Sequence, residues 1–292
     1  MAHDVLPKEE EEHSPALAEL LKEAEQYFNA AKAKNTKKAY ECDWSDFRAW
    51  CKRHGRSPLP GTPETVALYL THRARFLKVS TLGRRLSAIN EVHRAVGLKP
   101  SCKAQAVRTI WRGIKREKSE AQNRKSPALT KHIRNMLSSL PVNTLGTRDR
   151  ALLLLGFAGA MRRSELVGLD ISGLEQIEKG LIVTIRKGKT DQMGKGRKIG
   201  VPFGSHETTC PVKAVEAWLS TSGILEGALF RSVNRHGQVS SGRLGDRAVA
   251  LIVKRALVAA GINPKNFAGH SLRAGFATAA AMAGAGEREI QN

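Results

Sequence analysis

Two arginines and one histidine are the residues of this sequence best suited to chemistry on a phosphate. Arg162 lies within the segment Ala160–Leu166, and Arg273 follows His270 by three residues. A guanidinium can form two parallel hydrogen bonds to phosphate oxygens. With a histidine one helical turn from the second arginine, this set suggests chemistry on a nucleic-acid backbone.

The net charge points to the same class of partner. The 292 residues hold 48 Lys and Arg against 27 Asp and Glu, a formal net charge of +21. Such a field attracts a polyanion, so DNA or RNA is the expected partner, and a merely soluble basic protein is the plainer alternative. The four cysteines form no C-x-x-C pair and no zinc-site spacing, which indicates reduced thiols.

The same sequence argues for a cytoplasmic, nucleoid-associated protein that does not enter a membrane. An acidic run from Glu9 to Glu12 stands where a signal peptide would need apolar residues. The longest apolar stretch, residues 151–161, is about half as long as a membrane-spanning helix needs to be.

We expect two domains joined by a polar linker. The expected segments are a disordered acidic N-terminus at 1–14, a helical domain at 15–118, a linker at 119–127 and a second domain at 128–292. Four aromatic residues at intervals of four, three and three predict a core stripe on the first long helix: Tyr40, Trp44, Phe47 and Trp50.

Two successive helices of the first domain have a basic face opposite an apolar one. A basic helix face usually contacts only solvent, but two neighbouring helices with faces of the same charge favour a surface that contacts phosphates. The residues expected there are Arg84, Arg85, Asn90, Arg94, Arg108, Arg112 and Lys115.

The second domain is predicted to be helical around a small sheet. A helix begins at Thr130, and an apolar helix pair covers 148–169. Strands at 181–185 and 198–201 flank a loop rich in Gly and Lys, and further helices are expected at 211–221, 244–260 and 271–283. The fold class is therefore mainly α with a small antiparallel β-sheet.

Each site residue taken alone has an ordinary structural explanation. Arg162 and Arg273 stand in apolar sequence, where a guanidinium needs an anionic partner, and Glu165 at i+3 could supply a plain salt bridge to Arg162. His270 alone would more often be a capping or core histidine. The pairing of His270 with Arg273, and the basic hairpin between the two arginine sites, favours function instead.

At this point the residues resemble a known family. The stretch Gly159–Leu169 is similar to the first arginine box of the tyrosine recombinase (phage integrase) family, and Gly269–Gly275 is similar to its His-x-x-Arg box. The resemblance covers nearly the whole chain. It implies a helical core-binding domain at 15–118 and a mixed α/β catalytic domain of the Cre and Xer type from Ser126 onward.

The resemblance implies a role for each site residue. Arg162 and Arg273 would bind the non-bridging oxygens of the scissile phosphate, with His270 hydrogen-bonded to the same phosphate. Glu165 matches the acidic position that steadies this cluster. Lys189 matches the hairpin lysine that protonates the departing 5′ oxygen, while Lys187 and Lys195 on the same hairpin are the alternatives or DNA contacts.

The sequence departs from the family pattern at two places. Arg163 occupies a position that is usually apolar, so either adjacent arginine could point inward, although the box spacing favours Arg162. The family also places a nucleophilic tyrosine two to three dozen residues after the second arginine, whereas Tyr27, Tyr40 and Tyr69 all precede the boxes. We therefore expect residues 1–292 to bind DNA without cutting it, and to form the family's tetramer weakly.

The expected function is that of a site-specific recombinase acting on duplex DNA, with no metal and no cofactor. A non-catalytic DNA-binding regulator, or a topoisomerase or telomere-resolvase relative, is the alternative. Gly188–Thr190 imitates the end of a P-loop, but the first glycine of that motif would fall at Val183. A metal-dependent nuclease would need clustered carboxylates, which do not accompany the boxes.

Overall fold

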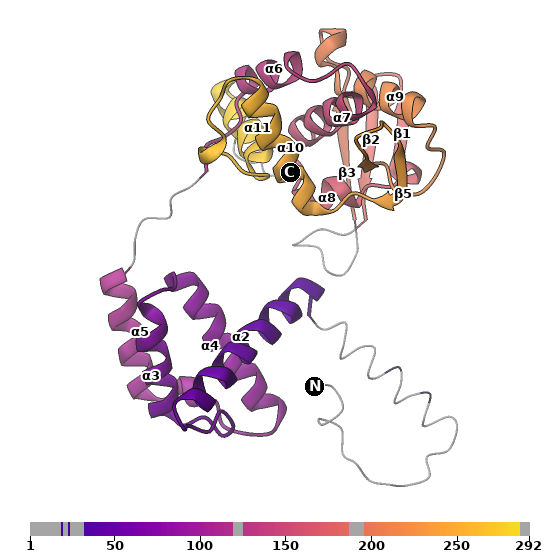
Figure 1. Ribbon diagram of the computed structural model, residues 1–292. Helices are drawn as coiled ribbons and strands as arrows, with labels where there is room; N and C mark the ends of the chain where they lie inside the picture. The colour runs from indigo at the N-terminus through magenta and orange to yellow at the C-terminus, as the bar shows by residue number, and fades with distance from the viewer. Residues whose placement is uncertain (1–18, 20–22, 24–31, 119–124, 187–195, 287–292) are drawn as a thin grey trace. The chain divides into compact units, whose positions relative to one another are not determined.

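The computed structural model describes residues 19, 23, 32–118, 125–186 and 196–286. The chain divides into two compact units, Met1–Gln122 and Asn123–Asn292 (Figure 1). In the described part of the chain, strands occur only in the second unit. No helix among these residues is both long and apolar enough to cross a bilayer.

The described helices of the first unit surround an aromatic core. They are α2 (Lys34–Arg53), α3 (Pro63–Ala74), α4 (Val79–Ala95) and α5 (Gln105–Lys118). Trp44, Phe47 and Trp50 of α2 are buried, as their spacing predicted, and Tyr40 is half-buried. The ring of Phe47 meets that of Tyr69 on α3 edge to face, with 4.9 Å between centroids, a favourable geometry for aromatic pairs.

The second unit packs its helices around a small sheet and one buried helix. The helices are α6 (Thr130–Ser138), α7 (Thr144–Ala158), α8 (Arg163–Gly168), α9 (Pro211–Ser222), α10 (Asp246–Ala259) and α11 (Ser271–Met282). The strands are β1 (Leu174–Ile177), β2 (Gly180–Ile185), β3 (Arg197–Pro202), β4 (Arg231–Val233) and β5 (Val239–Arg243). They form an antiparallel sheet of order β1-β2-β3 and a separate antiparallel β4–β5 pair.

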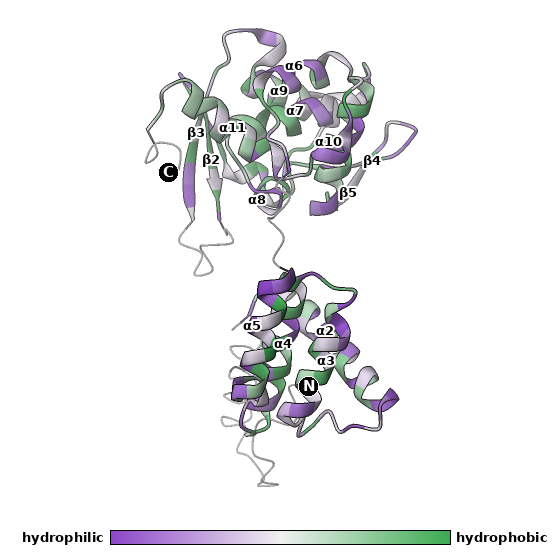
Figure 2. Ribbon diagram, turned by 90° about the vertical axis from the view of Figure 1, so that its left-hand side faces the viewer, coloured by the Kyte–Doolittle hydropathy of each residue, from purple (hydrophilic) through white to green (hydrophobic). Residues whose placement is uncertain are grey.

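The apolar run of α7 explains its central place. Residues 151–156 are all buried, and the hydrophobic colouring follows this helix in Figure 2. A helix that is apolar on every side lies in the core rather than at the surface. The expected fold class, mainly α with a small antiparallel sheet, is confirmed. The sequence patterns did not predict β1, β4 and β5, because most of their residues are exposed and alternate weakly.

A glycine of α7 lets α8 and α11 approach it closely. A Cβ atom added at Gly156 would lie 2.8 Å from Cδ2 of Leu166 on α8 and 3.2 Å from Cδ1 of Leu272 on α11. Both leucines are buried, and each adjoins a residue of the expected site. Their packing on Gly156 therefore brings Glu165 and Arg273 to the same end of α7.

A second close approach fixes the start of α11. The amide of Ala128 donates to the carbonyl of Ser271 at 2.8 Å, and the amide of Ser126 donates to that of Asn266 at 2.7 Å. A Cβ atom at Gly275 would collide with the carbonyl oxygen of Ala128. Glycine at this position thus lets α11 lie against the segment that leads into α6.

Gly275→Ala should lower the free energy of unfolding of the second unit by about 2 kcal/mol, because the added methyl group overpacks this contact. Calorimetric unfolding of the chain measures the change. Gly168→Ala is the matched control, since a Cβ atom there meets nothing within 4 Å. Equal, small effects of the two substitutions would contradict the packing described.

Candidate active site

The buried carboxylate of Glu165 organises the first arginine box. Arg162 is the residue just before α8, so it lies at the helix start rather than inside a helix. Its amide donates to Oε2 of Glu165 at 2.9 Å, and its Nη1 donates to Oε1 at 2.6 Å. The Glu165 side chain is 0 % exposed, whereas that of Arg162 is 24 % exposed. The carboxylate therefore holds the Arg162 guanidinium at the protein surface.

Arg273 reaches the same place from α11. Its Nη1 donates to the carbonyl of Ala160 at 2.8 Å. Ala160 has a φ of +47°, a left-handed conformation that costs an alanine about 1–2 kcal/mol. The strained turn after α7 thus presents a carbonyl to Arg273 and places Arg162 two residues further on.

Three charged side chains lie near enough to Arg273 to shift the pKa of its guanidinium. Burial lowers the pKa of its guanidinium, and the positive charges of Arg162 and Arg197 lower it further, while Glu165 opposes them. Arginine remains a cation at neutral pH nonetheless. Arg162 and Arg197 pair with the Glu165 carboxylate, and Arg273 lies within the range of its charge, so the three cations exceed this one anion by two charges.

Contacts with the turn before α11 distinguish the two adjacent arginines, Arg162 and Arg163. The stem of Arg163 lies against Gly269, where a Cβ atom would collide with Cδ of the arginine. The Nε atom of Arg163 is buried and has no hydrogen-bond partner among the described residues. His270 follows Gly269, directly precedes α11 and is exposed. Arg162, not Arg163, therefore shares Glu165 and the neighbourhood of Arg273.

Sequence reasoning missed Arg197 as a site residue. It is the first residue of β3, and its Nη2 lies 3.1 Å from Oε2 of Glu165. Its only signal in the sequence was its place at the end of the Gly- and Lys-rich loop. The contact depends on the strand register, which pairs Arg197 with Ile185, and on the path of α8.

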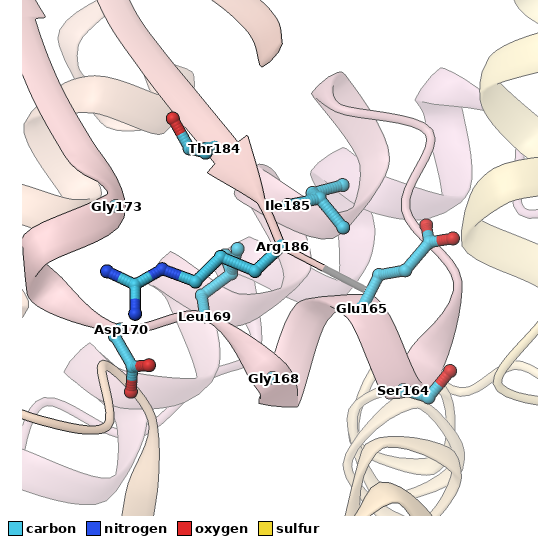
Figure 3. A pocket seen from close by; sticks show the side chains of 9 residues that line it. All are labelled: Ser164, Glu165, Gly168, Leu169, Asp170, Gly173, Thr184, Ile185 and Arg186. Atoms are coloured by element: carbon cyan, nitrogen blue, oxygen red, sulfur yellow. The ribbon is translucent and has the colours of Figure 1, made fainter. Parts of the chain in front are cut away.

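A cavity of about 340 Å³ adjoins the buried carboxylate (Figure 3). The residues that line it are Ser164, Glu165, Gly168, Leu169, Asp170, Gly173, Thr184, Ile185 and Arg186. The Arg186 side chain extends away from Glu165 in this view and donates to the Ser172 hydroxyl at 3.0 Å. Arg186 is therefore oriented away from the arginine cluster.

The three expected hairpin lysines, Lys187, Lys189 and Lys195, lie outside the described residues. Their roles stay predictions.

The expected DNA-facing residues of the first unit fall into two groups. Arg94, Arg108, Arg112 and Lys115 are exposed, and Asn90 is half-buried. Arg84 instead donates to both oxygens of Asp43 on α2, at 2.7 and 3.0 Å. Arg85 is largely buried, pairs with Asp46 and donates to the Tyr69 hydroxyl at 2.7 Å.

These ion pairs give the basic face of α4 a role within the first unit. Asp43 is buried on α2, and a buried carboxylate needs such cationic partners. Arg84 and Arg85 therefore hold α4 to α2 inside the unit. Contact of either arginine with DNA stays a prediction.

Comparisons with known proteins identify the family of this chain. Residues 127–292 match the model of the phage integrase family. The chain belongs to the phage integrase, or tyrosine recombinase, family. It is 41 % identical over 263 residues to an integrase/recombinase XerD homologue of Selenomonas ruminantium, covering 89 % of this chain and 77 % of that protein. It is 29 % identical over 262 residues to the Cre recombinase of Escherichia phage P1, covering 83 % and 75 %.

Solved structures share the fold of this family member. The integrase of the Tn1549 transposon, solved with transposon right-end DNA, matches with a TM-score of 0.65 at 16 % identity, covering 92 % of this chain and 88 % of that one. A lambda integrase dimer bound to a core site matches with a TM-score of 0.59 at 15 % identity, covering 94 % and 89 %.

The pKa of Glu165 gives this recombinase-family site a pH signature. Burial would raise the pKa of the carboxyl, but the hydrogen bonds from Arg162 and the charges of Arg162 and Arg197 outweigh burial and hold it below the ordinary value of 4.5. A depressed pKa stabilises the folded chain above the unfolded-state pKa, and this stability is lost as the pH falls through the folded-state value.

Glu165→Gln should therefore destabilise the second unit by about 2 kcal/mol at neutral pH, the usual cost of lost hydrogen bonds to a charged group. The difference from the unaltered chain should shrink as the pH falls below 4.5. Denaturant unfolding at several pH values measures it, with exposed Glu175→Gln as the control. A difference that stays constant into acid would contradict the ionised, paired state of Glu165.

Proposed function

We propose that this protein is a site-specific recombinase that binds duplex DNA and, with a tyrosine nucleophile in place, breaks and rejoins strands through a 3′-phosphotyrosyl intermediate. The observation that carries the proposal is the meeting of Arg162 and Arg273 around one buried carboxylate, with positive charge in excess. A phosphodiester in the transition state gains negative charge on its non-bridging oxygens, and fixed guanidinium groups there lower the barrier.

Each residue then has a distinct task. The tyrosine oxygen attacks phosphorus, and the bond from phosphorus to the 5′ oxygen breaks. Arg162 and Arg273 bind the non-bridging oxygens, and His270 hydrogen-bonds the same phosphate. Lys189 gives its proton to the departing 5′ oxygen. Glu165 holds Arg162 in place and does not touch the substrate.

The proximity of Arg162 and Arg273 supports an enzyme over a DNA-binding regulator. A regulator would need basic surfaces but no convergence of two arginines from separate segments of the chain. A topoisomerase or telomere-resolvase relative would share this cluster, so the recombinase assignment rests on the family and on its named relatives. Lambda integrase has also been solved as a tetramer bound to a Holliday junction. By analogy with that assembly, four copies of this chain would assemble on two DNA sites.

We expect duplex affinity to fall about a thousandfold or more between about 50 and about 200 mM salt, because phosphate contacts from both units release counterions. Titration of a fluorescent duplex at several salt concentrations measures the slope. Arg108→Gln should reduce the slope of log affinity against log salt concentration by about the amount of one phosphate contact. Arg243→Gln removes an intramolecular ion pair with Asp170 and should leave the slope unchanged. An affinity that barely changes with salt would refute phosphate-dominated binding.

Tyr69, one of the three tyrosines of this sequence, is poorly suited to act as the nucleophile. Tyr69 is fully buried, and its hydroxyl donates to Asp46 at 2.8 Å. Burial and that hydrogen bond raise the pKa of Tyr69, which weakens its oxygen as an attacking group. Tyr40 belongs to α2 of the first unit.

Residues 1–292 should consequently give no covalent adduct with a nicked duplex carrying the cognate site, read on a denaturing gel. In a form of the chain that carries a tyrosine after Arg273, adduct should appear, and Arg273→Met should slow it about 100-fold or more. An adduct from residues 1–292 that disappears with Tyr27→Phe, Tyr40→Phe or Tyr69→Phe would contradict this account.

A further inference from the structure

Arg197 makes a contact that the roles above do not use. It stands at the start of β3, opposite Ile185 of β2, and reaches the Glu165 carboxylate with Nη2. Arg186, the residue that follows β2, directs its guanidinium away from Glu165 (Figure 3). Arg186 and Arg197 both lie at the end of the β2–β3 pair where Ile185 and Arg197 are partners, and of the two, Arg197 is the one that contacts Glu165.

The two oxygens of Glu165 divide their partners unequally. Oε1 accepts from Nη1 of Arg162, while Oε2 accepts from the Arg162 amide and from Nη2 of Arg197. With Arg162 as its only cation, the fully buried carboxylate would largely neutralise the charge that Arg162 offers to a substrate. A second cation on Oε2 lowers that neutralisation and also fixes the carboxylate plane.

We propose that Arg197 is a positioning residue, which holds Oε2 of Glu165 so that Arg162 keeps both its orientation and its net charge toward a phosphate shared with Arg273. The inference rests on the proposed function of Arg162 and Arg273 as phosphate ligands. Two other roles are the alternatives. Arg197, 35 % exposed, could touch the phosphate itself, or its ion pair could serve stability alone.

Binding of inorganic phosphate to the 292-residue chain, followed by calorimetric titration, separates these roles. Arg197→Met removes the charge and keeps the stem, and Arg197→Lys keeps the charge. Arg197→Met should weaken phosphate binding about fivefold, a coupling at the low end of those between contacting residues. Arg197→Lys should restore most of the loss. Arg235→Met, at an exposed position of the β4–β5 loop, is the control and should change nothing.

A double-mutant cycle with Glu165→Gln tests whether Arg197 acts through Glu165. In that background Arg197→Met should cost less than about twofold. An equal loss in both backgrounds would mean direct phosphate contact and would overturn the positioning role. No loss in either background, while Arg273→Met still abolishes binding, would leave only structural stability for Arg197 and would also overturn it.

Failure of the proposed function has a different signature. If phosphate binds the unaltered chain and Arg273→Met and Arg162→Met leave it unchanged, the arginine pair is not the anion site, and both proposals fall.

A second readout does not depend on phosphate. The carboxyl carbon of Glu165, followed by NMR against pH, should titrate at higher pH in Arg197→Met than in the unaltered chain, because one of its two cationic partners is gone. Unchanged titration would overturn the inference even if the variant were less stable, since a general loss of stability does not move this pKa.

Discussion

The pairing of one buried carboxylate with arginines from separate elements underlies the whole site. Glu165 is enclosed by the core, where an unpaired negative charge would be severely destabilising. Its ion pairs therefore dictate where Arg162 and Arg197 lie, and the resulting cluster surrounds Arg273 with positive charge. Stability depends on this contact, and the proposed phosphate binding would depend on it too, because the carboxylate that needs cations also determines where they lie.

Backbone packing supplies the precision that the ion pairs alone would lack. Gly156 allows Leu166 and Leu272 to press α8 and α11 onto α7, and Gly275 allows α11 to approach Ala128. The left-handed turn at Ala160 then aims a carbonyl at Arg273. A strained alanine persists where its surroundings determine the conformation, and such strain is typical of functional sites.

Much of this arrangement could be predicted from the sequence, and the exceptions have physical causes. Periodicity predicted the long helices and the strands β2 and β3, since apolar residues recur along them at helical or alternating spacing. The two boxes predicted Arg162, Glu165 and Arg273. Arg197 was not predicted, because its contact with Glu165 arises from strand register and not from spacing along the chain.

The arginines of α4 show what helical periodicity alone leaves out. Helical periodicity correctly placed Arg84 and Arg85 off the apolar stripe, but it could not show that Asp43 and Asp46 of α2 face them. A residue on the polar side of a helix is exposed only if no other element covers it. Charge patterns along one helix therefore do not show which of its polar residues pair with another element of the fold.

The most direct test of the central claim is a crystal of the chain soaked with tungstate, a tetrahedral and electron-dense analogue of phosphate. We expect one anion within hydrogen-bonding distance of both Arg162 and Arg273, with Glu165 still paired to Arg162 and Arg197. Side chains of Arg162 and Arg273 directed to different sides of the second unit, or an anion bound by neither of them, would contradict it.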